Sequence, residues 1–274
     1  MRNPVVVGVT GSSAGLAAVR SAAREAVSRG RPLRIVHAFR WAAGVDYDQA
    51  RRTASRVVDE ATATAQRSTP GVRVTGQIVD GPAEQVLIRL SRSADLLVLG
   101  DDDLATTPWL PPNSVLVQTV ARAWCPVMVA RGPRPPAGPV LAAVDGSSST
   151  LMVLRHAAAE GARRRVPVEV LYVVRETDDA ARRLLADAVA AVPALVRSNA
   201  RILHGVPGPA LVRASGRGRM IVLGPRGSHE SGLLGSVARE LLHRAACPTV
   251  FVHGRTLPTQ RIPGRLSRRS RLPM

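Results

Sequence analysis

The sequence contains no lysine, so all 38 of its basic residues are arginines. A phosphate-binding loop of the Gly-Lys-Ser/Thr type is therefore excluded, because that loop needs its lysine. Aromatic residues make up only 3% of the chain, which argues against a surface on which nucleic-acid bases stack. No uncharged apolar run reaches the roughly 18–20 residues that a membrane-spanning helix requires, so we expect no membrane span.

Cysteine is also scarce, and the two cysteines, Cys125 and Cys247, each precede a proline at matching places in the chain. A repeated Cys-Pro step indicates a packing position rather than half of a disulfide. The first thirteen residues, MRNPVVVGVTGSS, contain an apolar run shorter than the core of a secretory signal, which has about 7–15 residues. We therefore expect the protein to reside in the cytoplasm.

The net charge is +18, and it is unevenly distributed. Residues 1–137 carry 17 arginines and 11 acidic residues, whereas residues 138–274 carry 21 arginines and 9 acidic residues. Six of these arginines lie in the tail 254–274, which has no acidic residue and is rich in Pro and Ser. This composition predicts a disordered tail. The tail would contact nucleic acid or another anionic surface, or simply remain solvated, and both alternatives stay open.

Three segments of the chain occur twice in the same order. They are VVVGVTGSS at 5–13 and VLAAVDGSS at 140–148, DLLVLG at 95–100 and RMIVLG at 219–224, and WCPVMVA at 124–130 and ACPTVFV at 246–252. Such self-similarity indicates one domain that has been duplicated. We expect a first repeat at 1–131, a Pro-rich linker at 132–139, a second repeat at 140–253 and the basic tail at 254–274. Each repeat is long enough to have a core of its own.

Short apolar runs alternate with segments of helical periodicity throughout both repeats. The expected strands are 5–9, 33–39, 72–79, 96–99 and 126–130, then 140–144, 168–174, 198–203, 220–223 and 248–252. The expected helices are 14–29, 48–68, 82–92 and 113–123, then 148–163, 178–192, 207–215 and 235–245. Regular alternation of this kind predicts an α/β fold. Each repeat would be a doubly wound domain in which helices flank both faces of a five-stranded parallel sheet.

A doubly wound sheet binds its ligands beyond the carboxyl ends of its strands, where the strand order reverses. In the second repeat, Asp145, Gly146 and Ser147 follow the first strand and would lie there. The glycine-rich segment that starts at Gly224 would lie there too, and its glycines allow a phosphate to approach the backbone closely. Gly235 and Ser236 then begin a helix, whose N-terminus favours an anion.

Taken together, these motifs make the chain similar to a tandem universal stress protein. The resemblance depends on the VDGS turn at 144–147, the ADLLVLG run at 94–100, and the glycine loop that leads through GSV to a Cys-Pro step. It implies a five-stranded parallel sheet in each repeat. It also implies an ATP site in which a G-x2-G-x9-G-[S/T] loop holds the phosphates and an Asp after the first strand approaches the adenosine.

On this resemblance, the second repeat retains most of an ATP site. The predicted nucleotide-binding residues are Asp145, Gly146, Ser147, Val173, Leu223, Gly224, Arg226, Gly227, Gly235, Ser236 and Val237. Arg226 is the best candidate for a cation facing phosphate, because a guanidinium matches phosphate geometry. The second repeat departs from the pattern in two ways: seven residues rather than nine separate Gly227 from Gly235, and Pro225 lacks an N–H that could bind phosphate.

The first repeat keeps the loop length but loses the chemistry of the site. Thr10 stands in place of the Asp, and Asp103 and Asn113 stand in place of the two glycines, so that only Ser114 remains. The acidic run 101–103 places like charges where the phosphates would lie. We therefore expect no ATP in the first repeat. Adjacent carboxylates in a loop are usually solvated, and we predict no metal site there.

These features predict a stress-response or signalling protein that binds ATP, if at all, in its second repeat. No residue set suggests a general base or a catalytic metal, so we expect no enzyme, with slow ATP hydrolysis at most. The alternatives are a nucleotide-free interaction scaffold and a protein that associates with nucleic acid through its tail. As in the family that it resembles, the chain would form a homodimer or an intramolecular pseudo-dimer by pairing the last strands, 127–130 and 249–252.

Overall fold

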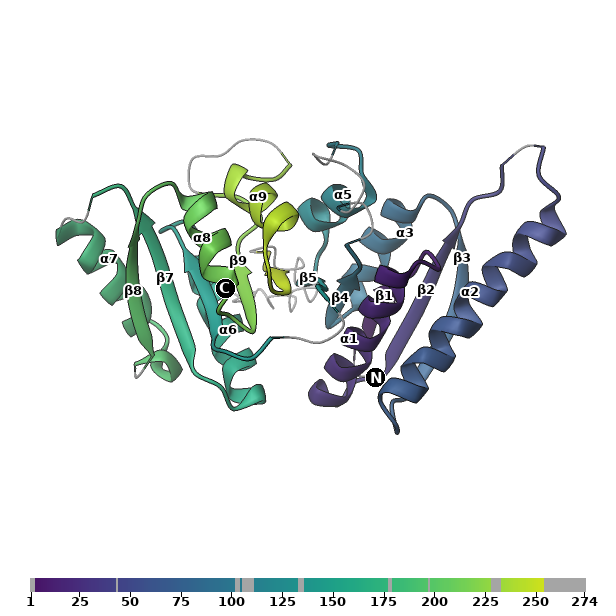
Figure 1. Cartoon of the computed structure of the whole chain (residues 1–274), viewed down its shortest axis with the longest axis horizontal. Coiled ribbons are helices and arrows are strands. Elements are labelled where there is room, and N and C mark those ends of the chain that lie inside the picture. The colour runs from purple at the N-terminus through teal and green to yellow at the C-terminus, as the bar shows by residue number, and fades with distance from the viewer. Residues whose placement is uncertain are drawn as a thin grey trace, which may run out of the picture.

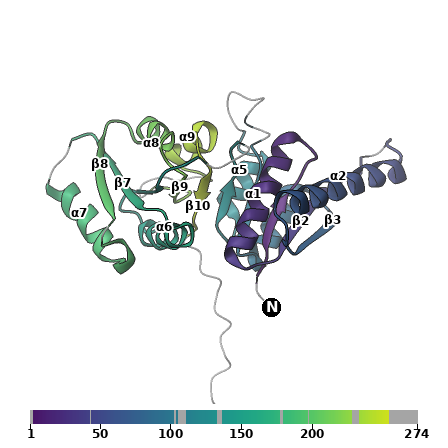
Figure 2. The ribbon, with the colours of Figure 1, turned by 60° about the horizontal axis from the view of Figure 1, so that its bottom comes forward.

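A computed structural model describes residues 3–42, 44–101, 104, 111–132, 136–176, 179–196, 198–227 and 233–253. Within these residues the chain forms one ten-stranded sheet that runs through both repeats, which lie side by side (Figures 1 and 2). The strand order is β3-β2-β1-β4-β5-β10-β9-β6-β7-β8. No helix in the described ranges is long and apolar enough to cross a membrane.

The first repeat contributes the strands β1 to β5, which pair in parallel. Their bounds are β1 Val5–Gly8, β2 Leu33–Phe39, β3 Val74–Asp80, β4 Leu96–Leu99 and β5 Val127–Val129. The helices are α1 Ser13–Arg29, α2 Tyr47–Ser68, α3 Ala83–Leu90 and α5 Val115–Arg122, with a 3-10 turn at Ser91–Ser93. A serine caps α1: the Ser12 hydroxyl accepts a hydrogen bond from the Gly15 N–H at 2.9 Å.

The second repeat has the same plan, again with parallel pairing. Its strands are β6 Val140–Val144, β7 Val168–Val174, β8 Asn199–His204, β9 Met220–Leu223 and β10 Thr249–Phe251. Its helices are α6 Thr150–Arg164, α7 Asp179–Ala190, α8 Pro207–Ser215 and α9 Ser236–Arg244, with a 3-10 turn at Pro193–Leu195. The predicted α/β class, its doubly wound topology and the parallel sheet within each repeat are thus confirmed.

The two repeats meet through their last strands. β5 and β10 pair in the antiparallel direction, with Met128 opposite Val250, which confirms the expected contact. Two further contacts repeat across this seam: Arg131 donates a hydrogen bond to the Leu242 carbonyl, and His253 Nε2 donates one to the Val120 carbonyl. Each of these residues follows the last strand of its own repeat and reaches the last helix of the other. The interface is therefore isologous, like that of a two-fold dimer.

The expectation of two separate cores is wrong, because the apolar side chains form two layers that each extend through both repeats. One layer includes Val5, Leu154 and Val250, and the other includes Leu97, Leu241 and Phe251. Pairing of β5 with β10 makes the sheet continuous, so the residues on each face of one repeat pack onward against those of the other. Both cysteines are buried and free, and burial raises the pKa of each thiol to about 12. They are packing residues, as predicted.

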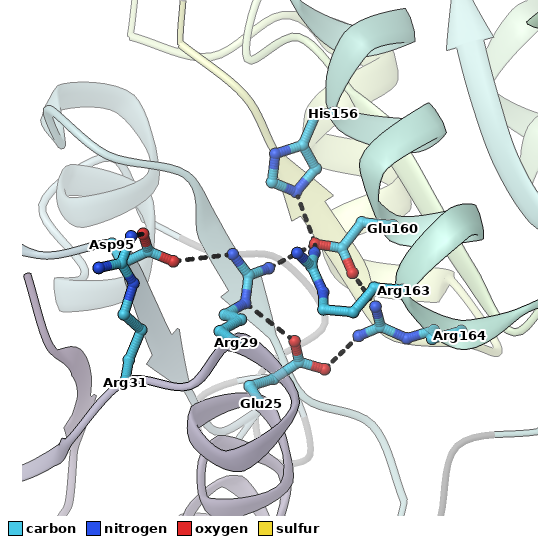
Figure 3. A network of polar contacts seen from close by, with 8 residues as sticks. All are labelled: Glu25, Arg29, Arg31, Asp95, His156, Glu160, Arg163 and Arg164. Atoms are coloured by element: carbon cyan, nitrogen blue, oxygen red, sulfur yellow. Dashed lines mark hydrogen bonds and ion pairs between the residues drawn. The ribbon is translucent and has the colours of Figure 1, made fainter. Parts of the chain in front are cut away.

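A network of buried charges also joins the repeats, where the C-terminal turns of α1 and α6 face each other (Figure 3). Arg29 of α1 pairs with Glu160 of α6, and Arg164 of α6 pairs with Glu25 of α1. Each arginine also contacts the glutamate of its own helix. These residues occupy equivalent places in the two repeats, so the arrangement has two-fold symmetry.

Other residues surround this network unequally. Asp95 contacts Arg29 at 3.0 Å and Arg31 at 3.2 Å on the side of the first repeat. On the other side, Arg163 pairs with Glu160, and His156 Nε2 lies 3.3 Å from a Glu160 oxygen. Burial would raise the pKa of Glu25, but attraction to Arg164 and Arg29 outweighs it and holds that pKa below its ordinary value. Burial, with the nearby Arg29, lowers the pKa of His156 to about 3.

Candidate functional site

A cavity of about 290 Å³ lies at the carboxyl ends of β6, β7 and β9, under α8 and α9. This is the point where the strand order of the second repeat reverses, since β6 lies between β7 and β9. Its walls are mostly apolar, with Asp145, Arg226 and Ser236 as the polar side chains. The lining residues are Ala143, Val144, Asp145, Val173, Pro207, Leu211, Leu223, Gly224, Arg226, Gly227, Ser236, Val237 and Ala238.

The turn after β6 places a carboxylate at the mouth of this cavity. Asp145 is exposed, and its Oδ1 accepts a hydrogen bond from the Ser147 N–H at 3.0 Å. Gly146 has φ +76°, and a Cβ there would lie 2.9 Å from a Leu184 methyl group, so the turn requires glycine. In the described part of the chain, the second carboxylate oxygen has no partner. It can therefore accept a hydrogen bond from a ligand hydroxyl or amino group.

The segment after β9 forms another wall. A Cβ on Gly224 would lie 2.3 Å from the Ser149 Oγ, so glycine allows β9 to end against the start of α6. Arg226 follows as an exposed cation in the cavity wall. The Gly235 N–H donates to the Pro225 carbonyl at 2.9 Å, which brings the two ends of the glycine-rich segment together. Between these two residues, the segment 228–232 lies outside the described ranges.

The N-terminus of α9 closes the site. Gly235 is its N-cap, and glycine has no side chain that could accept hydrogen bonds from the first turn. Ser236, Val237 and Ala238 of this turn all line the cavity. Arg226 and the positive end of the α9 dipole belong to the same wall, because the hydrogen bond from Gly235 to Pro225 holds the start of α9 next to Arg226. This side suits an anionic group, and the apolar walls suit a flat or apolar one.

Most of the predicted site residues line this one cavity: Asp145, Val173, Leu223, Gly224, Arg226, Gly227, Ser236 and Val237. Gly146, Ser147 and Gly235 do not line it, but they shape the turn and the helix start beside it. Sequence reasoning missed the wall formed by Pro207 and Leu211 of α8. The four-residue spacing of these two, at the start of a helix that follows an edge strand, was the only available signal.

The equivalent cavity in the first repeat is smaller, about 130 Å³, and its walls are almost wholly apolar. Thr10 takes the place of Asp145, and its hydroxyl donates to the Ser12 Oγ at 3.0 Å. Ser114 caps α5 by accepting from the Val117 N–H at 3.2 Å, so its oxygen serves the helix. Asp101 pairs with Arg131 at 3.4 Å, whereas Asp102, Asp103 and Pro108 lie outside the described residues.

Comparison with known proteins agrees with this geometry. The model of the universal stress protein family matches residues 1–131 and again residues 137–253. The chain belongs to the universal stress protein family. Two copies of the family domain in one chain make it a tandem member.

Similar proteins share this organisation over nearly their whole length. A universal stress protein of Mycobacterium tuberculosis, strain H37Rv, is 28% identical over 90% of this chain and 95% of its own. One of Mycolicibacterium smegmatis is 27% identical over 92% of this chain and 97% of its own. The crystal structure of a universal stress protein from Archaeoglobus fulgidus has a TM-score of 0.72 at 15% identity, and covers 91% of this chain and 96% of that one. At that identity the likeness concerns the fold alone.

Proposed function

We propose that this tandem universal stress protein binds an adenine nucleotide, such as ATP, in its second repeat, and acts as a signalling or assembly protein rather than as an enzyme. The observation that carries the proposal is the composition of the second-repeat cavity. It combines an exposed carboxylate at Asp145, an exposed guanidinium at Arg226 and the N-terminus of α9 around one apolar space. A nucleoside has the hydroxyl and amino donors that a carboxylate accepts, and its phosphates suit the other two features.

Regulation rather than catalysis is proposed because the cavity offers little acid–base chemistry. Asp145 is the one carboxylate among the described lining residues, and no histidine or cysteine lines the cavity with it. Hydrolysis of a phosphate ester needs a positioned base or metal to activate water. Groups of three or more His, Cys, Asp or Glu that could hold a metal ion do not occur in the described ranges. Binding would thus serve to stabilise one state of the second repeat, which a partner then recognises.

Isothermal titration of ATP into the full chain tests the proposal. We expect saturable binding of about one ATP per chain. Asp145→Ala should weaken it by removing the acceptor, and Gly235→Asp should abolish it by placing a negative charge at the N-terminus of α9. The matched control is Thr10→Ala at the equivalent position of the first repeat, which should leave binding unchanged.

Three other results would overturn the proposal in different ways. No heat of binding at millimolar ATP would leave the interaction scaffold as the better interpretation. Binding that is unaffected by Asp145→Ala and Gly235→Asp would place the nucleotide elsewhere. Binding of nucleic acid alone, with a strong salt dependence, would favour association through the arginine-rich chain surface or the tail 254–274, which lies outside the described residues.

A further inference from the structure

A second open groove lies in the first repeat, at the amino ends of its strands, whereas the nucleotide cavity lies at the carboxyl ends of the strands of the second repeat. It has a volume of about 750 Å³ and lies where the strands of the first repeat begin. Its walls come from the start of four elements and contain several hydrogen-bond donors. The lining residues are Asn3, Pro4, Pro32, Leu33, Arg34, Arg73, Thr75 and Ser93.

Two arginines of this groove have no counter-charge among the residues that the structure describes. Arg34 is half-buried and Arg73 is exposed. Neither guanidinium forms a hydrogen bond or ion pair with any residue that the structure describes. Asp95, whose N–H donates to the carbonyl of the lining residue Pro4, is already engaged by Arg29 at 3.0 Å and Arg31 at 3.2 Å. Two cations thus line one groove without a carboxylate between them, which favours an anion from outside.

In the second repeat, a carboxylate neutralises the arginines at the corresponding place. Arg34 is the second residue of β2, and the second residue of β7 is Glu169. The Glu169 side chain is only 6% exposed, and it binds Arg201 at 3.1 Å and also pairs with Arg217. The second repeat therefore supplies an internal carboxylate for its two arginines. In the first repeat a cation replaces that carboxylate, and the groove stays open.

We propose that this groove binds a small multivalent oxyanion, a molecule with two or more phosphate or carboxylate groups. Arg34 and Arg73 would each form charge-assisted hydrogen bonds with it, because a planar guanidinium matches both oxyanions. The Asn3 amide and the Thr75 hydroxyl line the same groove and can donate further hydrogen bonds. This site is separate from the nucleotide cavity, which lies in the other repeat and shares no lining residue with the groove.

Isothermal titration of the full chain with pyrophosphate and, separately, with citrate tests the proposal and distinguishes phosphate from carboxylate ligands. At least one of them should bind saturably at one site. Arg34→Gln and Arg73→Gln should each weaken that binding about tenfold or more, since each removes a charge-assisted bond. Arg34→Glu, which introduces the carboxylate found in the second repeat, should abolish it. Thermal unfolding of each variant would show that the fold is intact.

Arg155→Gln is the matched control, because Arg155 is an exposed arginine of α6 that has no partner in the described part of the chain. It changes the net charge equally and should not affect binding. Asp145→Ala and Gly235→Asp, which alter the proposed nucleotide site, should leave binding of the probe anion unchanged, and this separates the two sites. The proposal is overturned if neither probe binds, if Arg34→Gln and Arg155→Gln behave alike, or if only an oligonucleotide binds.

Discussion

After its first strand the first repeat has Thr10, where the second repeat has Asp145, yet both turns continue with a glycine of positive φ, Gly11 at +89° and Gly146 at +76°. Each glycine is required by a neighbour, since a Cβ would lie 2.9 Å from Val57 in one repeat and 2.9 Å from Leu184 in the other. The backbone of the turn is thus needed for folding in both repeats. Only the second repeat keeps a charged group there, so the glycine turn alone does not indicate a ligand.

The largest expected difference between the two repeats concerns the charge network that joins them. Glu160 and Glu25 are equivalent by symmetry, but Glu160 is fully buried and also contacts Arg163 and His156. Glu160→Gln removes the buried charge that Arg29, Arg163 and Arg164 share, which should lower the free energy of unfolding by about 3–5 kcal/mol. Glu25→Gln should cost less. Urea-induced unfolding of the full chain measures both changes.

A control and a contrary result complete this test. Asp179 and Arg182 form an ion pair whose side chains are 76% and 64% exposed, so Asp179→Asn should have little measurable effect. If Glu160→Gln were as mild as Asp179→Asn, the network would not join the repeats energetically. If Glu25→Gln were the more damaging change, the added contacts of Glu160 would not be the reason for the difference.

The next test uses pH. His156 of the second repeat is titratable, whereas Ser21, at the equivalent position of the first repeat, is not. The folded-state pKa of His156, about 3, is below the ordinary value of 6.5, so the unfolded chain takes up a proton first as pH falls. Stability should therefore decrease as pH falls from about 6.5 towards 3. Between pH 7.5 and pH 5 the loss should be about 2 kcal/mol. His156→Gln should remove this part of the dependence, as measured by urea unfolding at each pH.

Other groups set the limits of that experiment. The pKa of Glu25 is also lowered, so its contribution to stability is present above its ordinary value of 4.5 and is lost only at lower pH. The contribution of Glu25 to stability also decreases as pH falls, but mainly below pH 5. We expect this contribution to be the same in His156→Gln as in the wild-type chain. Equal pH profiles for the wild-type chain and His156→Gln between pH 7.5 and pH 5 would show that His156 is not held neutral in the folded state.

The strands and helices could be predicted from the sequence because they depend on periodicity and on the repeat itself, whereas the pairing of the last strands was implied by the resemblance to the family. The sequence did not predict the shared core or the charge network. Glu25 with Arg29, and Glu160 with Arg164, are spaced four residues apart, as in pairs on a solvated helix face. Nothing in that spacing shows that the two helix ends meet. At the site, the turn and glycine residues have local signals, whereas the α8 wall at Pro207 and Leu211 arises only from tertiary packing.

The smallest expected effects concern the C-terminal ends of α1 and α6. The two repeats have different residues there, but the backbone has the same left-handed conformation. Gly30 ends α1 with φ 61°, and Arg165 ends α6 with φ 54°. A residue with a Cβ is strained in this left-handed region, whereas glycine is not. Arg165→Gly should therefore raise the free energy of unfolding by about 1 kcal/mol, and Gly30→Ala should lower it by a similar amount. Urea unfolding of both variants makes the comparison.

The two changes act on equivalent backbones, so they test the strain itself rather than a side-chain contact. Arg165→Ala is the matched control, since it removes the same exposed side chain but keeps a Cβ. It should leave stability nearly unchanged while Arg165→Gly increases it. Should Arg165→Ala stabilise the chain as much as Arg165→Gly does, the cost at this helix end would come from the arginine side chain, which lies beside Arg163 and Arg164, and the backbone difference between the repeats would carry no energy.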